Sequence, residues 1–163
     1  MASTKQTDTK PDPIPSDRPR LGPYITVDNG QAALDFYTTV FGGVVESCMA
    51  EPSGRIGHAE IRIGDSVLSI SDEYPEYGAK SPKTLGGSAT MLQLYVEDCD
   101  DVVQRATDAG ATVAQPVEDQ FYGDRGGKII DPFGHKWWIA TRVEDVSVEE
   151  QHRRAGELYG LTG

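Results

Sequence analysis

The sequence is poor in cysteine and in positive charge. Cys48 and Cys99 are its only cysteines, and neither lies in a CxxC pair or at the spacing from a histidine that a zinc site needs. A disulfide framework is therefore excluded, and we expect two reduced, packed thiols. The chain has 15 Lys and Arg residues against 26 Asp and Glu residues, a formal net charge of −11. Because an acidic surface repels phosphates, we expect no nucleic-acid partner.

Long apolar runs are also missing. No stretch approaches the roughly 20 apolar residues that span a bilayer, and the N-terminus lacks the apolar segment of a signal peptide. We therefore expect a cytoplasmic protein without a membrane partner. Four prolines among polar residues predict that residues 1–20 form a disordered tail. This tail carries four basic and three acidic side chains, so the rest of the chain carries a net charge of −12.

What is present is one domain with an internal repeat. The 163 residues, 37% of them hydrophobic, suffice for a single core. At an offset of 68 to 69 positions, residues 24–45 match 93–113 in pattern, and residues 58–72 match 127–141. Each half therefore predicts the order strand, helix, strand, strand, strand. Such a half covers only one face of its sheet with a helix, so the other face needs a partner or a ligand.

Capping residues support the predicted helices. Asn29 and Asp98 stand where a side chain caps the first turn, and Gly42 and Gly110 stand where a left-handed residue ends a helix. A last helix opens at the capping box 147–150. Its sparse apolar content predicts that it rests on the outside of the domain or on a neighbouring subunit.

The motifs ALDFYTTVFGG, FYGDR and DPFGHKWW, in this order, resemble the vicinal oxygen chelate superfamily. That group includes glyoxalase I, extradiol dioxygenases and the bleomycin- and fosfomycin-resistance proteins, and the chain looks most like its PhnB-like branch. The resemblance implies an α+β fold of two βαβββ modules, a U-shaped eight-stranded mixed sheet around a cleft, and a homodimer. The expected units are the tail 1–20, the domain 21–142 with modules 21–85 and 88–142, and the C-terminal helix and tail 143–163.

Strand alternation indicates which side chains would line that cleft. Ile25 and Val27 match the positions that face a helix, so Tyr24 points to the other face. The other strands, read in the same way, give a polar and aromatic lining that suits a flat or partly polar small molecule. The loop after residue 120 is expected to contribute further side chains to the cleft. The predicted ligand-binding residues are therefore Tyr24, Ser69, Gln93, Tyr95, Tyr122, Arg125 and Trp138.

Metal-dependent members of the superfamily take one histidine or glutamate ligand from the first and fourth strands of each half. The matching positions here are Gly22, Ser69, Met91 and Trp138. Glycine and tryptophan offer no usable donor, and serine and methionine are poor ligands for such ions. We therefore expect no metal and no other cofactor.

Glu60 and His58 are the candidate catalytic residues. They lie two positions apart and so share one face of a strand. If Glu60 is enclosed against Trp138 and Tyr95, burial raises its pKa and suits it to abstract a proton next to a carbonyl. The alternative is the polar side of an ordinary strand, with Glu60 paired to Arg62 or Arg125.

The glycine-rich segment after Tyr122 has two interpretations. Arg125 can hold a carboxylate or phosphate within a mobile gate, or Asp124 and Arg125 can simply pair with each other. The other histidines are interpreted as structural or solvated. His135 is expected to be exposed in a turn, and His152 to be solvated on the last helix.

These features favour a metal-independent protein that encloses a small organic molecule, with lyase or isomerase chemistry if Glu60 acts as a base. The alternative is a non-catalytic protein that sequesters an antibiotic or metabolite. Because an acidic surface attracts cations, the net charge points to neutral or cationic ligands. A third class, a structural module that binds a protein partner, predicts no enclosed pocket.

Overall fold

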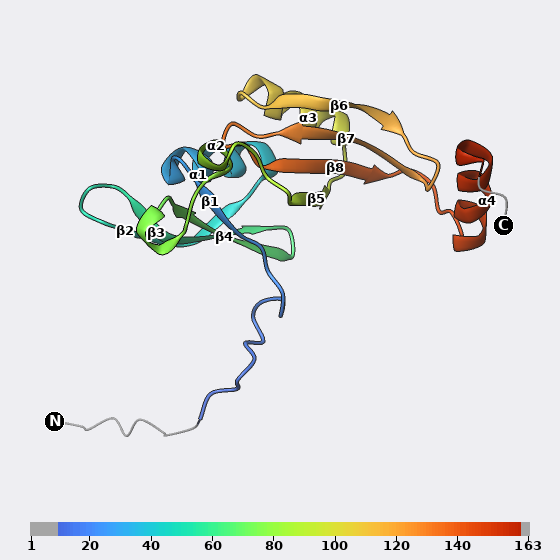
Figure 1. The fold of residues 1–163 in the computed structure, drawn as a ribbon. Coiled ribbons are helices and arrows are strands. Elements are labelled where there is room, and N and C mark those ends of the chain that lie inside the picture. The colour runs from blue at the N-terminus through green and yellow to red at the C-terminus, as the bar shows by residue number, and fades with distance from the viewer. Residues whose placement is uncertain (1–9, 161–163) are drawn as a thin grey trace.

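The computed structural model describes residues 10–160 and contains two four-stranded sheets (Figure 1). Sheet one has the strand order β1 (Tyr24–Val27), β4 (Ser66–Asp72), β3 (Ile56–Ile63), β2 (Val44–Ala50). Sheet two has the order β5 (Met91–Tyr95), β8 (Lys136–Arg142), β7 (Asp124–Ile130), β6 (Thr112–Asp119).

The two sheets repeat one pairing scheme. In each, the first strand pairs in parallel with the fourth, and the other neighbours are antiparallel. One helix follows the first strand of each half: α1 (Gly30–Phe41) in the first and α3 (Cys99–Asp108) in the second. The predicted α+β fold of two βαβββ modules is therefore confirmed, with the eight strands divided equally between two sheets.

The predicted caps form as expected. The side chain of Asn29 accepts a hydrogen bond from the N–H of Ala32, and that of Asp98 accepts one from the N–H of Asp101. Gly42 ends α1 with a φ of 68°, a left-handed conformation that glycine adopts without steric cost. The positions of both helices could thus be read from local sequence alone.

The two modules meet on the sides of their sheets that carry α1 and α3. The buried core is one cluster with members from both modules, and α1 contacts α3 as well as sheet one. The rings of Tyr37 and Phe41 on α1 pack against Trp137 of β8, with centroids 5.5 and 4.7 Å apart. Each sheet therefore has an inner apolar face on this shared core and a polar face on the outside.

A buried carboxylate joins the modules. Asp131, in the turn between β7 and β8, is 3% exposed and accepts hydrogen bonds from the Tyr37 hydroxyl at 2.6 Å and the Trp137 Nε1 at 2.8 Å. Burial, and then the neighbouring Asp131 carboxylate, raise the pKa of Tyr37 well above its ordinary value. The phenol stays protonated and serves as a donor between the modules.

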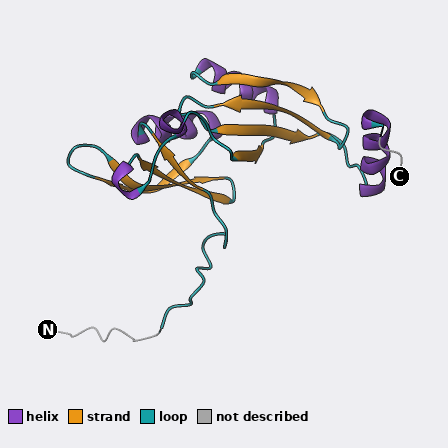
Figure 2. Cartoon of the chain, viewed as in Figure 1, coloured by secondary structure: helices purple, strands orange, loops and turns teal. Residues whose placement is uncertain are grey.

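Shorter elements and the chain ends complete the structure (Figure 2). Residues 10–23 precede β1 without a helix or strand. The segment between the modules contains the 3₁₀ turn η1 (Pro75–Tyr77) and the short helix α2 (Pro82–Leu85). The last helix, α4 (Val148–Tyr159), opens at its predicted serine cap and has no buried residue. Among residues 10–160, none of these helices is long and apolar enough to cross a membrane.

Candidate functional site

The outer side of each sheet carries one row of side chains that crosses all four strands. Registered pairs place Ser47, Glu60, Ser69 and Tyr24 side by side on sheet one, a surface that we call the first polar face. The corresponding row on sheet two, the second polar face, consists of Gln115, Lys128, Trp138 and Gln93. At the repeat offset of 68 to 69 positions, Glu60 corresponds to Lys128 and Ser69 to Trp138.

The first polar face holds a hydrogen-bonded chain of three side chains. The Tyr24 hydroxyl lies 3.2 Å from Nδ1 of His58, and Nε2 of the same ring lies 3.5 Å from Oε1 of Glu60. The candidate pair of the sequence is thus brought together, with Tyr24 as its third member. Because the Glu60 carboxylate only accepts, this contact requires a proton on Nε2 of His58, and Nδ1 of the neutral ring then accepts from the Tyr24 hydroxyl.

Glu60 is paired to neither of the arginines expected for it. Nη1 of Arg18, in the segment before β1, lies 2.6 Å from its Oε1. The hydrogen bond from Arg18 is the main cause that lowers the pKa of Glu60 below its ordinary value, with a smaller contribution from His58. This direction is opposite to the one expected from enclosure against Trp138 and Tyr95, which lie on the other sheet. Arg62 instead pairs with Glu46.

A hollow of about 440 Å³ lies beside this chain on the first polar face. Tyrosine rings dominate its walls, and Tyr24 belongs both to the hollow and to the hydrogen-bonded chain. Ser71, predicted to point to this side of β4, is 4% exposed. The lining residues are Tyr24, Gly57, Ser71, Tyr74, Tyr77 and Ala79.

A second hollow, also of about 440 Å³, lies on the second polar face. Trp138 forms its floor and is 8% exposed, with Lys128 beside it on the neighbouring strand. This face therefore combines an indole ring, two amides and an ammonium group. Its lining residues are Met91, Gln93, Gln115, Tyr122, Lys128 and Trp138.

Tyr95 lies at the end of this face and anchors a buried carboxylate. Its hydroxyl donates to Oδ2 of Asp124 at 2.7 Å, and that hydrogen bond is the main cause that raises the pKa of Tyr95. Asp124 is 4% exposed. It does not pair with Arg125, so the pairing considered for these two residues is wrong.

Arg125 lies on the side of sheet two that carries α3. Its guanidinium contacts Asp100 at 2.7 Å and Asp119 at 3.0 Å, so both carboxylates already occupy its donors. The following glycines lie inside β7, where they make room for neighbours and do not act as hinges. A Cβ on Gly126 would lie 2.9 Å from the carbonyl oxygen of Ile139. Arg125 therefore belongs to neither polar face.

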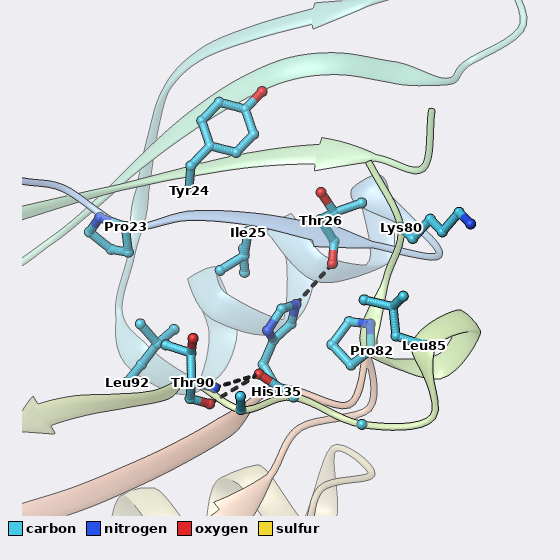
Figure 3. Close-up of a pocket in the computed structure, with 13 residues that line it drawn as sticks. Pro23, Tyr24, Ile25, Thr26, Lys80, Pro82, Leu85, Thr90, Leu92 and His135 are labelled. Atoms are coloured by element: carbon cyan, nitrogen blue, oxygen red, sulfur yellow. Dashed lines mark hydrogen bonds between the residues drawn. The ribbon is translucent and has the colours of Figure 1, made fainter. Parts of the chain in front are cut away.

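His135 is buried and not exposed as expected. It is 9% exposed, and its Nε2 lies 2.9 Å from the carbonyl oxygen of Thr26. Figure 3 shows this contact inside a pocket of about 380 Å³ between the modules, with Tyr24 on the opposite side of β1. The turn motif around His135 does not by itself indicate this contact with the backbone of β1, so the prediction of an exposed histidine was wrong. His152 is exposed, as predicted.

The four positions that match the superfamily's metal ligands do not fit a metal. Ser69 lies on sheet one, whereas Met91 and Trp138 lie on sheet two, and Gly22 has no side chain. This donor set contains no imidazole and no carboxylate. Within residues 10–160, no three His, Cys, Asp or Glu side chains gather closely enough to hold an ion.

Two site features escaped sequence reasoning. The contact from Arg18 joins residues 42 positions apart, and the first of them lies in a segment without periodicity. The correspondence of Lys128 with Glu60 was available from the repeat, because both sit at one position of the aligned strands. At this position the first polar face carries the negative charge of Glu60, and the second carries the positive charge of Lys128.

Comparisons with known proteins agree with this architecture. Residues 20–139 match the profile of the Glyoxalase/Bleomycin resistance protein/Dioxygenase superfamily. Rv0887c of Mycobacterium tuberculosis, an uncharacterized protein, is 40% identical over 135 residues, which cover 81% of this chain and 79% of the relative.

Solved structures show the same fold at low identity. The PhnB protein from Bacillus cereus has a TM-score of 0.60 at 16% identity and covers 74% of this chain and 98% of its own. The fosfomycin resistance protein FosX from Mesorhizobium loti has a TM-score of 0.58 at 13% identity, with coverages of 82% and 95%. The family profile, which matches most of the chain, and the two observed βαβββ modules lead to one conclusion: the protein belongs to the Glyoxalase/Bleomycin resistance protein/Dioxygenase superfamily.

Proposed function

We propose that the protein binds a small organic molecule between the first polar face of one copy and the second polar face of another copy. The observation that carries this proposal is the orientation of the two faces. Both are hollowed, yet they lie on the outer sides of one chain because the apolar faces meet in the core. A cleft with both faces as walls requires a second copy.

The chemistry of the walls suits a flat molecule with a few polar groups. The first face offers phenol rings, an imidazole and a carboxylate, and the second offers an indole, two amides and an ammonium group. Aromatic surface supplies most of the binding free energy in such sites, and a few polar groups fix the orientation of the ligand. The large exposed side chains Tyr24, Met91 and Tyr95 are 56, 47 and 56% exposed in the single chain. Such exposure supports a partner at both faces.

Binding without turnover is the form of this function that the electrostatics favour. A general base works best with a pKa near the operating pH, whereas the Arg18 contact lowers that of Glu60. A fosfomycin resistance protein shares the fold, which places antibiotics among the ligands to test. The second candidate, lyase or isomerase chemistry with Glu60 as base, is supported by the Tyr24, His58 and Glu60 chain.

The first test is to identify the molecule that co-purifies with the native protein by mass spectrometry and to titrate it back. We expect Gln93→Ala to weaken its binding about fivefold to tenfold, the effect of losing one hydrogen bond in a cleft. Gln104→Ala is the matched control, because Gln104 lies on α3, away from both polar faces, and its side chain donates to Asp108. Equal affinities of the two variants would remove the second polar face from the binding site.

The same molecule separates binding from catalysis. If the protein only binds, the molecule is recovered unchanged after prolonged incubation in D₂O. If Glu60 abstracts a proton, wild-type protein introduces deuterium or converts the molecule, and Glu60→Gln abolishes that reaction. Proton NMR and mass spectrometry of the recovered molecule decide between these results.

The proposed cleft also predicts a dimer. Light scattering of the full chain is expected to give twice the 17.7 kDa mass of one copy at micromolar concentration. The reason is that hydrophobic side chains on the polar faces and on α4 remain exposed in one chain, including Val148, Leu158 and Tyr159. A constant single-chain mass over that concentration range contradicts the shared cleft.

A further inference from the structure

We propose that Glu60 is the recognition point for a cationic group of the ligand, of the guanidinium, amidinium or ammonium class, and that Arg18 of the same chain occupies this point as an internal competitor. This inference rests on the proposed function, since it assigns a ligand chemistry to the first polar face.

The contact between Arg18 and Glu60 has the geometry of ligand recognition. A guanidinium nitrogen lies 2.6 Å from the carboxylate, a short contact of the charge-assisted kind. The Glu60 side chain is 15% exposed, so the carboxylate is largely covered. The backbone of the segment is held as well, because Nη2 of Arg62 lies 3.4 Å from the carbonyl oxygen of Asp17. The chain thus presents its own cation to the candidate site.

The surroundings of Glu60 suit a cation. Glu60 contacts His58, and His58 contacts Tyr24, which lines the hollow together with Tyr74 and Tyr77. Cations bind favourably over such aromatic faces. The same module already shows this geometry, since the guanidinium of Arg55 lies 3.5 Å from the centroid of the Tyr74 ring, which leaves the rings of Tyr24 and Tyr77 for a ligand.

The distribution of charge also favours a cationic group at Glu60. The chain carries a net charge of −11, which attracts cations and repels anions over long range. On the second polar face the position that corresponds to Glu60 is Lys128, which has the opposite charge. The two faces therefore discriminate between the ends of a ligand, and a cationic group belongs on the first.

Displacement of Arg18 by a ligand requires little free energy. Arg18 lies in a segment without a helix or strand, and its side chain is 39% exposed, so solvent reaches the arginine side of the ion pair and weakens the contact. A ligand cation that also contacts the tyrosine rings gains interactions that Arg18 does not make. Removal of the Arg18 side chain should then raise the affinity about threefold to fivefold, which corresponds to about 1 kcal/mol.

The test uses benzamidine, benzamide and benzoate, which have similar shape but different charge. Each is titrated by NMR into the full-length wild type and into Arg18→Ala, Arg20→Ala and Glu60→Gln. Arg20→Ala is the matched control, because it removes the same charge from the same exposed segment. We expect benzamidine to bind Arg18→Ala about threefold to fivefold more tightly than wild type, and Arg20→Ala to behave as wild type. Glu60→Gln should lose at least tenfold.

Three results would overturn the inference: equal affinities in Arg18→Ala and Arg20→Ala, benzoate binding as tightly as benzamidine, or benzamidine binding that survives Glu60→Gln. The proposed function fails separately, through the Gln93→Ala titration and the light scattering. If Gln93→Ala weakens binding of the co-purified molecule but Glu60→Gln does not change benzamidine binding, the shared cleft is supported and the cation site is refuted. If benzamidine binding requires Glu60 but the protein remains monomeric, the cation site is supported and the shared cleft is refuted.

Discussion

Replacement of Asp131 by alanine is expected to lower the free energy of unfolding by about 3–5 kcal/mol, because several buried donors lose a charged acceptor at once. Asp131 accepts hydrogen bonds from the Tyr37 hydroxyl at 2.6 Å and the Trp137 Nε1 at 2.8 Å. It also accepts hydrogen bonds from the backbone N–H groups of Phe133 at 3.0 Å and His135 at 2.9 Å. One buried side chain therefore satisfies four donors from α1, β8 and the turn between β7 and β8.

Loss of the carboxylate leaves these donors buried without their acceptor. Each buried donor that loses its partner costs about 1–3 kcal/mol, although neighbouring groups do not contribute additively. Because Tyr37 belongs to the first module and Trp137 to the second, the substitution also loosens the contact between the modules. Asp131→Asn keeps one acceptor oxygen and should lie between the alanine variant and wild type.

Urea unfolding measures this difference. The control is Asp65→Ala, in the corresponding turn between β3 and β4, because Asp65 is exposed and accepts only from the Ser66 hydroxyl. We expect the control to change stability by less than about 0.5 kcal/mol, as surface substitutions usually do. An Asp131→Ala protein as stable as this control means that the buried hydrogen bonds do not hold the modules together.

Local signals predicted each module well. Asn29 and Asp98 cap their helices as predicted, and residues 131–134 form a turn in which the N–H of Gly134 donates to the carbonyl oxygen of Asp131. These features depend on side chains and backbone groups only a few positions apart. The internal repeat then extended the assignment from one half to the other, because the same pattern requires the same pairing of strands.

The arrangement of the modules could not be derived in this way. The apolar residues of both inner faces are compatible with two sheets side by side and with two sheets that share a core. Contacts between distant residues decide, such as Tyr37 with Asp131 and His135 with Thr26, and these have no signature in local sequence. The orientation of the polar faces, and with it the need for a second copy in the proposed cleft, follows from those contacts.

The site itself was predictable in part. The repeat and strand alternation placed Tyr24, Glu60, Gln93 and Trp138 on polar faces, because the period of a strand is fixed. Charge partners were not predictable, since Arg18 reaches Glu60 from a segment without any pattern. The expected direction of the Glu60 pKa was therefore reversed by a side chain that sequence reasoning had assigned to a tail.

Gly123→Ala is expected to be the second severe substitution, with a loss of about 3 kcal/mol from backbone strain and steric overlap together. Gly123 precedes β7 and has a φ of 99°, which disfavours any side chain. An added Cβ would overlap the carbonyl oxygen of Glu144 and approach Cγ2 of Val146 to 2.8 Å. The Gly123 carbonyl also accepts hydrogen bonds from the N–H groups of Val143 and Glu144, so the backbone at Gly123 cannot shift without loss of these bonds.

Gly54→Ala separates the two causes of this loss. Gly54 has a similar φ of 88°, but an added Cβ there meets no atom within 4 Å, so only backbone strain of about 1 kcal/mol remains. Urea unfolding of both variants should show Gly123→Ala as the less stable by about 2 kcal/mol, the contribution of overlap with a backbone that has no room to move. If the two variants are equally stable, the segment 143–146 is not packed against Gly123. The attachment of α4 then depends on other contacts, such as the hydrogen bond from Arg154 to the carbonyl oxygen of Phe121 and the packing of Tyr159 on Phe121.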